Sequence, residues 1–183
     1  YGVGKLAAEH YLGVYAKLVP SVILRMFNVY GPGQDMENMR QGMVSIFLNM
    51  ALTQGCVQVR GRLDRYRDFV FIEDVVDIWV RAMRLEGREG RTLNVGAGRR
   101  TTVEALLKEM ARFVPGMTWH SGEPTAGDQF GIYADTAKLR RVLGVCQFTD
   151  LSDGLPRFVE WARQVLDLSG KRGEPEKRRS SFV

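Results

Sequence analysis

Tyr1 and Lys5 are four positions apart in the opening run YGVGK, and this spacing could support proton chemistry. On a helix, side chains four residues apart lie one above the other on the same face. A phenol has a pKa of about 10 and is a poor base at neutrality, but a neighbouring ammonium favours the phenolate and lowers that pKa. A tyrosine activated in this way can accept the proton of an alcohol. Because the same spacing also occurs on ordinary surface helices, the interpretation depends on the rest of the chain.

The hydrophobic pattern predicts the elements that position this pair. Helical periodicity continues past Lys5 until Pro20 and predicts a helix over residues 1–18. Apolar runs predict strands at 21–28, 56–60, 69–72 and 92–95. Further helices are expected at 41–54, after a cap at Asp74, from a capping box of Thr101 and Glu104 through Val114, after a cap at Asp135 to Leu143, and at 152–168.

Strands that alternate with helices are typical of a parallel α/β sheet. The sequence lacks the Gly-x-Gly-x-x-Gly fingerprint that binds dinucleotide phosphates at the first helix of such a fold. Gly96-Ala97-Gly98 follows a predicted strand, but Thr101 stands where the third glycine would be. We therefore interpret this segment as a tight strand-to-helix turn.

Composition argues against several classes of protein. The net charge of +5 is concentrated in residues 171–183, which carry +3 and are expected to form a disordered basic tail. No basic stripe interleaved with aromatic residues suggests a nucleic-acid binder. No apolar run has transmembrane length, and nothing resembles a signal peptide. Cys56 and Cys146 lack metal-ligand spacing, as do His10 and His120, and we expect a reducing cytoplasm and no metal.

Five segments, in order along the chain, resemble the extended short-chain dehydrogenase/reductase family in its nucleotide-sugar epimerase and dehydratase branch. They are Tyr1-Gly2-x-x-Lys5 with Glu9, Arg25-x-Phe27-Asn28-Val29-Tyr30-Gly31-Pro32, the run RDFVFIEDVV at 67–76, the run LNVGAG at 93–98, and Gly127-Asp128 before Tyr133-Ala134-Asp135. Together they span residues 1 to about 165.

The resemblance implies the C-terminal part of a Rossmann-type doubly wound parallel sheet plus a smaller α/β substrate-binding lobe. Residues 1–30 and 73–98 would belong to the Rossmann-like domain, and residues 31–72 and 99–170 to the nucleotide-sugar lobe. In this family the half that binds the phosphates of NAD precedes the tyrosine. We therefore expect NAD to be bound mainly by a half that is not in this sequence, and the chain to be inactive alone.

The resemblance also implies roles for individual residues. Tyr1 and Lys5 become the catalytic pair and, with Met26, contact NAD. Phe27 and Asn28 end a strand, with the Asn28 amide donating to the sugar diphosphate. Arg67 matches the position of a diphosphate-binding arginine, whose planar fork suits two phosphate oxygens. Several arginines cluster here, and it is the register with the family that selects Arg67.

Three neighbouring positions match the strand that borders the nucleobase: Gln58, Val59 and Arg60. An aromatic residue is common in the family at the position of Arg60, although a guanidinium can also stack on a base. Val44 lies in the helix start that covers the nucleotide in the family, and its apolar side chain is equally expected in a core.

The sequence also departs from the family pattern at a second position, which concerns binding of the diphosphate. Many family members carry another diphosphate-binding arginine near the position of Thr125. Either Arg99 or Arg100 takes the place of that arginine, or the diphosphate is bound less tightly. Asp128 could hydrogen-bond a ribose or sugar hydroxyl, or it could be a turn carboxylate.

The resemblance therefore implies an NAD-dependent nucleotide-sugar epimerase, similar to the UDP-glucose 4-epimerases, that oxidises a sugar hydroxyl transiently. A dehydratase or UDP-glucuronate decarboxylase of the same family, and a non-catalytic nucleotide-sugar-binding fragment, remain alternatives. The expected partner is a UDP-linked sugar. Family members often form homodimers through the Tyr/Lys helix, to which four residues here could contribute: Leu6, His10, Leu12 and Tyr15.

Overall fold

The computed structural model describes residues 1–87, 91–123, 129–145 and 147–168. The elements, in chain order, are α1 (Gly2–Val14), β1 (Val22–Met26), β2 (Asn28–Tyr30), α2 (Met43–Gln54), β3 (Cys56–Arg60), β4 (Tyr66–Arg67), β5 (Phe69–Phe71), α3 (Ile72–Met83), β6 (Arg91–Val95), β7 (Thr101–Thr102), α4 (Val103–Ala111), β8 (Thr118–Gly122), α5 (Ala137–Leu143) and α6 (Leu151–Leu168). No helix among the described residues has the length and apolar character to cross a membrane.

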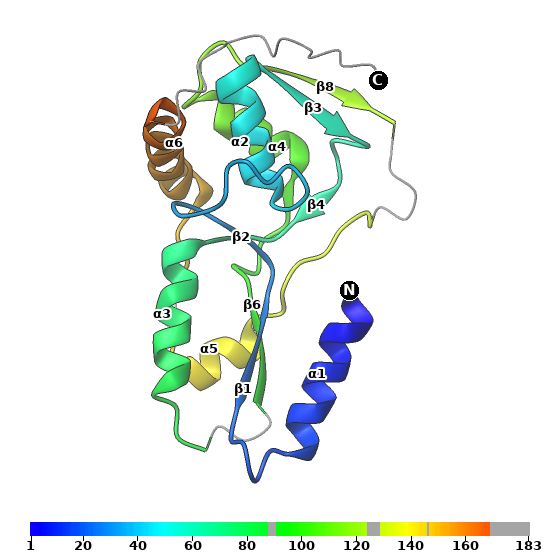
Figure 1. Ribbon diagram of the computed structural model, residues 1–183, viewed down its shortest axis with the longest axis vertical. Helices are drawn as coiled ribbons and strands as arrows, with labels where there is room; N and C mark the ends of the chain where they lie inside the picture. The colour runs from blue at the N-terminus through cyan, green and yellow to red at the C-terminus, as the bar shows by residue number, and fades with distance from the viewer. Residues whose placement is uncertain (88–90, 124–128, 146, 169–183) are drawn as a thin grey trace, which may run out of the picture.

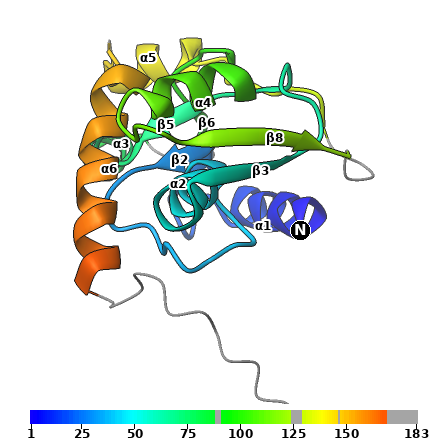
Figure 2. The ribbon, with the colours of Figure 1, turned by 90° about the horizontal axis from the view of Figure 1, so that it is seen from above.

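The strands of the described residues form four two-stranded pairs. The pairs β1–β6, β2–β5 and β3–β8 are parallel, and the short pair β4–β7 is antiparallel. The β1–β6 pair lies between α1 on one face and α3 and α5 on the other (Figures 1 and 2). Helices and mainly parallel strands confirm the predicted α/β class.

Two hydrophobic clusters fill the interior. One lies around β6, α3 and α5 and includes Val75, Ile78, Leu93, Val95 and Leu139. The other is built mainly from α2, β3, α4 and α6 and includes Leu48, Val57, Leu106, Leu107, Met110, Leu155 and Phe158. The finer division into a Rossmann-like part and a substrate lobe stays a prediction, and the expected basic tail lies outside the described residues.

The strand predicted at 21–28 is divided in two at Phe27. β1 pairs with β6 and β2 pairs with β5, because the chain changes partners where the Phe27 N–H donates to the Val95 carbonyl at 2.9 Å. Phe27 and Asn28 therefore lie at the carboxyl end of β1. In parallel α/β sheets this end is where ligands bind.

Two of the predicted helix caps are displaced. Thr101 is held in β7 opposite Arg67, so α4 starts one residue later and Thr102 Oγ1 accepts from Ala105 N at 3.0 Å. Asp74 does not cap α3 but lies in its first turn, where its carboxylate accepts from the backbone N–H and hydroxyl of Thr149.

The third cap is nearly as predicted. Thr136 is the N-cap of α5, while Asp135 Oδ1 accepts from the Ala137 N–H at 2.9 Å.

Candidate functional site

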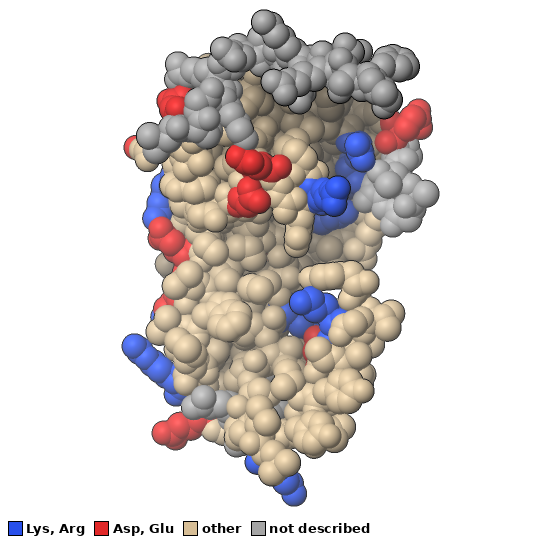
Figure 3. All heavy atoms as spheres, in the orientation of Figure 1, with Lys and Arg blue, Asp and Glu red and all other residues tan. Residues whose placement is uncertain are grey.

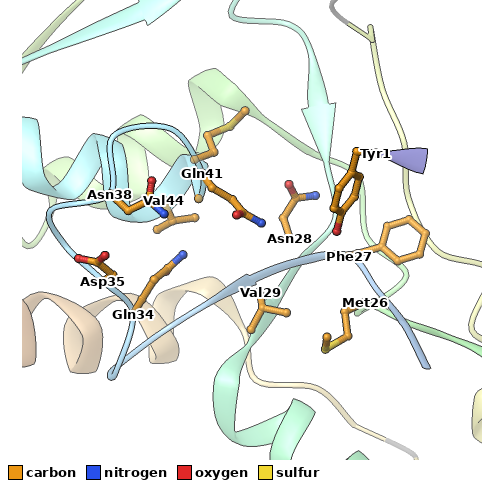
Figure 4. A pocket seen from close by; sticks show the side chains of 12 residues that line it. Tyr1, Met26, Phe27, Asn28, Val29, Gln34, Asp35, Asn38, Gln41 and Val44 are labelled. Atoms are coloured by element: carbon orange, nitrogen blue, oxygen red, sulfur yellow. The ribbon is translucent and has the colours of Figure 1, made fainter. Parts of the chain in front are cut away.

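A hollow of about 430 Å³ opens at the carboxyl end of β1, and we call it the Tyr1 hollow. Its lining comes from the start of α1, the β1–β2 junction, the loop 34–42 and the start of α2 (Figure 4). Five residues predicted for the site line it together: Tyr1, Met26, Phe27, Asn28 and Val44. Segments far apart in the sequence thus meet where the resemblance predicts catalysis.

Tyr1 and Lys5 have the relative placement that their spacing predicts. The Lys5 N–H donates to the Tyr1 carbonyl at 3.1 Å, which is the first hydrogen bond of α1. This turn brings Lys5 Nζ to 5.4 Å from the centre of the Tyr1 ring. The Tyr1 side chain is 95% exposed, so its hydroxyl is open to a ligand entering the hollow. Lys5 does not line the hollow itself and lies behind Tyr1 on the helix.

An ion pair between Glu9 and Arg25 links α1 to β1. Arg25 Nε donates to Glu9 Oε1 at 2.8 Å, and a second guanidinium nitrogen donates to Oε2 at 2.5 Å. The hydrogen bond with Arg25 lowers the pKa of Glu9, and the bond with Glu9 raises the pKa of Arg25. α1 buries none of its residues, so this two-pronged contact is important for setting Tyr1 over the end of β1.

Asn28 is fixed by the main chain of Asp68. Its backbone N–H donates to the Asp68 carbonyl at 3.1 Å, and its side-chain Nδ2 donates to the same oxygen at 3.3 Å. One amide hydrogen and the amide oxygen remain for a ligand.

Asp68 is a structural anchor of the site that we did not predict, although it lies in a motif we identified. Its carboxylate is completely buried and accepts from the N–H groups of Ala97, Gly98 and Ala134 at 2.9, 2.9 and 3.0 Å. A carboxylate directly before the apolar run Phe69–Phe71 could have indicated such a buried role.

Arg67 is half-buried but does not line the Tyr1 hollow. Its guanidinium donates to the carbonyl oxygens of Tyr66 at 2.8 Å and Phe130 at 3.4 Å. Burial, together with the nearby Arg65 charge, lowers the pKa of Arg67. Its contact with a diphosphate stays a prediction.

The neighbouring arginines have other roles. Arg65 is buried and donates to the carbonyl oxygens of Arg62 and Arg60, while Arg62 pairs with Asp64 at the surface. On the face shown in Figure 3, the Lys and Arg side chains of the described residues lie in small separate groups and form no continuous stripe.

The residues predicted to border the nucleobase alternate along β3. Val59 is 2% exposed and packs into the core, so it could contact a ligand only through its backbone. Gln58 and Arg60 are exposed on the opposite face, and Gln58 is in register with His120 of β8. All three remain predictions, and Asp128 lies outside the described residues.

Both candidates for a replacement diphosphate clamp have intramolecular partners. Arg99 forms an ion pair with Asp150. Arg100 donates to the Tyr133 hydroxyl at 2.9 Å, with its guanidinium 4.3 Å from the Tyr133 ring centre and 5.5 Å from that of Tyr66. Neither lines the Tyr1 hollow.

Four polar residues that we did not predict line the hollow opposite Tyr1: Gln34, Asp35, Asn38 and Gln41. The sequence signal was a polar loop between a strand and a helix, which by itself is typical of any surface connection.

Comparison with known proteins identifies relatives of this fold and site. Residues 1–96 match the model of the NAD dependent epimerase/dehydratase family. The UDP-glucose 4-epimerase of Mycolicibacterium smegmatis is 34% identical over 170 residues, which cover 89% of this chain and 52% of that protein. Relatives of the chain include nucleotide-sugar epimerases, dehydratases and decarboxylases.

Two solved structures extend the comparison. The UDP-glucose 4-epimerase of Thermotoga maritima with UDP-glucose has a TM-score of 0.82 and 33% identity, over 91% of this chain and 54% of that one. MoeE5 in complex with UDP-glucuronic acid and NAD has a TM-score of 0.80 and 31% identity, over 91% of this chain and 56% of that one. The chain spans about half the length of the relatives it matches.

Proposed function

The chain belongs to the NAD dependent epimerase/dehydratase family, and we propose that its Tyr1 hollow is the sugar-binding part of a nucleotide-sugar epimerase site. The observation that carries this proposal is the convergence of Tyr1, backed by Lys5, and Asn28 on one hollow. A UDP-linked hexose is the proposed substrate, because the epimerases of M. smegmatis and T. maritima are named for UDP-glucose.

Tyr1 takes the proton of a sugar hydroxyl. Lys5 Nζ, 5.4 Å from the centre of the phenol ring, places a positive charge beside the group that accepts this proton. After the sugar has turned in the hollow, Tyr1 returns the proton. Asn28, fixed by the Asp68 carbonyl, orients the diphosphate through its remaining amide hydrogen.

The residues beside Tyr1 fit a nicotinamide cofactor. Met26 is half-exposed and offers an apolar, polarisable surface to a flat ring, while the exposed Lys5 ammonium can donate to ribose hydroxyls. When bound, NAD would supply a reversible hydride acceptor for the carbon whose hydroxyl Tyr1 deprotonates, so that hydride and proton both return to the sugar after it has turned. Lys5 and Met26 hold and orient that group against the sugar side of the hollow.

The nucleotide end of the ligand extends toward Arg67 and β3. Arg67 contacts the diphosphate. Val44, which is 2% exposed, lies beneath the nucleotide at the start of α2, and the exposed Gln58 and Arg60 border the base with the backbone of Val59. Arg67 is partly desolvated, and removal of water strengthens its attraction for phosphate oxygens.

The proposed protein is a homodimer in the cytoplasm. α1 exposes apolar side chains that a partner copy can cover, among them Leu6, Tyr11 and Tyr15. Cys56 is a free thiol, which suits a reducing compartment.

Binding of UDP-glucose to the natural protein that contains this chain, loaded with NAD, tests the proposal. Asn28→Ala should weaken binding by about tenfold, because a charge-assisted hydrogen bond to the diphosphate is lost. Gln54→Ala serves as the control, since it removes an exposed side-chain amide at the end of α2 that does not line the hollow. Equal affinity of the Asn28 variant and the unchanged protein would contradict the proposal.

A further inference from the structure

The wall of the Tyr1 hollow opposite the tyrosine is polar. Loop residues Gln34, Asp35, Asn38 and Gln41 line this wall, and they lie across from Tyr1 in Figure 4. A sugar whose reacting hydroxyl contacts Tyr1 in this hollow can present other substituents to this loop.

The three amide side chains of this wall match hydroxyl groups. An amide both donates and accepts hydrogen bonds, as a sugar hydroxyl does. The Gln34 side-chain oxygen is buried away from the hollow, whereas its side-chain nitrogen points into the hollow in Figure 4, where it can donate to a ligand hydroxyl. Asn38 Oδ1 accepts from the Arg40 N–H at 3.0 Å, which leaves its NH₂ group to donate.

The polar wall of the hollow carries negative charge. Among the described residues that line the hollow, Asp35 is the charged side chain, and no Lys or Arg is present. Asp35 Oδ1 accepts from the Glu37 N–H at 2.9 Å, and this turn fixes the carboxylate in the loop. Arg40 is exposed and is not among the lining residues. A sugar carboxylate would meet a like charge here without a compensating cation.

We propose that the Tyr1 hollow selects an uncharged, hydroxyl-rich hexose and rejects a hexuronate, with Gln34 and Asp35 as specificity-determining residues. This inference rests on the proposed nucleotide-sugar function. It also distinguishes this chain from MoeE5, which has been solved with UDP-glucuronic acid and with UDP-glucose.

Calorimetry on the natural protein loaded with NAD tests the inference with three ligands: UDP, UDP-glucose and UDP-glucuronic acid. UDP-glucose should bind roughly threefold or more tightly than UDP-glucuronic acid, because only the uronate places a sugar carboxylate beside the exposed Asp35. Asp35→Asn should reduce that ratio by a factor of about three or more, since it removes the like charge while preserving the shape. Glu37→Gln makes the same charge change in the same loop outside the lining, and it should leave the ratio nearly unchanged.

A second variant locates the sugar. Gln34→Ala should weaken UDP-glucose by roughly fivefold or more, because the hydroxyl bonded to the amide loses its partner, while UDP alone binds as before. Unchanged UDP affinity also shows that the variant is folded.

The possible results separate a failure of the proposed sugar selectivity from a failure of the proposed nucleotide-sugar function. If UDP binds but UDP-glucuronic acid binds as tightly as UDP-glucose, the inference is wrong while the proposed function stands. The inference would also be wrong if UDP-glucuronic acid bound tightly and Arg40→Gln abolished that binding, because Arg40 would then be the cation that compensates the sugar carboxylate. If none of the three ligands binds, the proposed function fails and the inference fails with it.

Discussion

The carboxylate of Asp68 accepts a hydrogen bond of 3.0 Å from the backbone N–H of Ala134, 66 positions further along the chain. The same carboxylate accepts hydrogen bonds from the backbone N–H groups of Ala97 and Gly98, in the turn that follows β6. The main-chain carbonyl oxygen of Asp68 accepts a hydrogen bond from the Asn28 side chain. A Cβ atom on Gly96 would lie 2.5 Å from Asp68 Oδ2, so the turn can approach this closely only with glycine. Asp68 thus ties two distant segments, the turn after β6 and the segment around Ala134, to Asn28, the residue that we propose orients the diphosphate.

Asp68→Asn is therefore expected to destabilise the protein by about 2–4 kcal/mol, because one amide oxygen cannot replace two carboxylate oxygens and the new NH₂ group faces backbone donors. Urea unfolding of the natural protein measures the free energy. Asp64→Asn is the matched control at the surface, where the carboxylate pairs with exposed Arg62, and it should change stability much less than Asp68→Asn. Equal effects of the two substitutions would contradict the anchoring role of Asp68.

The Glu9–Arg25 pair predicts a pH dependence of stability. Because the hydrogen bond with Arg25 lowers the folded-state pKa of Glu9 below its ordinary value of 4.5, the folded protein favours the ionised form. This contribution is complete above 4.5 and is lost as the pH falls through the lower, folded value. We expect about 0.2–1 kcal/mol, because Arg25 is half-exposed to solvent.

Unfolding free energies measured across this acid range, for the unchanged protein and for Glu9→Gln, check the prediction. The variant should lose less stability on acidification. Glu86→Gln controls for the removal of one acidic side chain elsewhere. Parallel acid profiles for the protein and the Glu9 variant would mean that the ion pair does not hold α1.

Tyr30 carries a buried hydroxyl that forms no hydrogen bond with the described residues. The side chain is 1% exposed, and Oη has no hydrogen-bond partner among the described residues. Tyr30→Phe is expected to be neutral or to stabilise the protein by up to about 1 kcal/mol, because an unsatisfied buried group is removed. Tyr133→Phe, which removes the hydroxyl bonded to Arg100, should instead destabilise slightly. A loss of more than about 1 kcal/mol in Tyr30→Phe would show that the hydroxyl is satisfied.

The same residue has a consequence at alkaline pH. Burial, together with the Asp74 and Asp153 charges, raises the pKa of Tyr30 above its ordinary value of 10.0. The unfolded chain ionises first, so stability falls as the pH rises above that value. Tyr30→Phe should lose less stability in this range, and identical alkaline profiles would contradict the prediction.

The sequence predicted most elements because their hydrophobic periods are clear. β3 has the predicted bounds, and the strand predicted at 92–95 is lengthened by one residue to Arg91. The helix caps predicted at Thr101 and Asp74 were wrong because tertiary contacts, which leave no local hydrophobic pattern, determine the positions of both residues. Pairing with Arg67 holds Thr101 in a strand. The Asp74 carboxylate accepts a hydrogen bond from Thr149, which lies 75 positions away.

The same limit applies to the site. Tyr1, Lys5 and Asn28 carry their chemistry in motifs, so they were predicted from local sequence. Gln34 and Asp35 gain their significance only because the loop that contains them folds back to face Tyr1. No local pattern distinguishes them from other polar loop residues.

Turnover by Tyr1→Phe tests the central claim most directly. The natural protein, supplied with NAD and UDP-glucose, should convert the sugar to its epimer, and Tyr1→Phe should lower kcat by at least about 100-fold, because phenylalanine cannot accept the hydroxyl proton. The affinity for UDP should remain unchanged, since the nucleotide does not contact the phenol in the proposed site. Turnover by the variant at the rate of the unchanged protein would contradict the account, and so would a failure of the unchanged protein to convert any UDP-hexose.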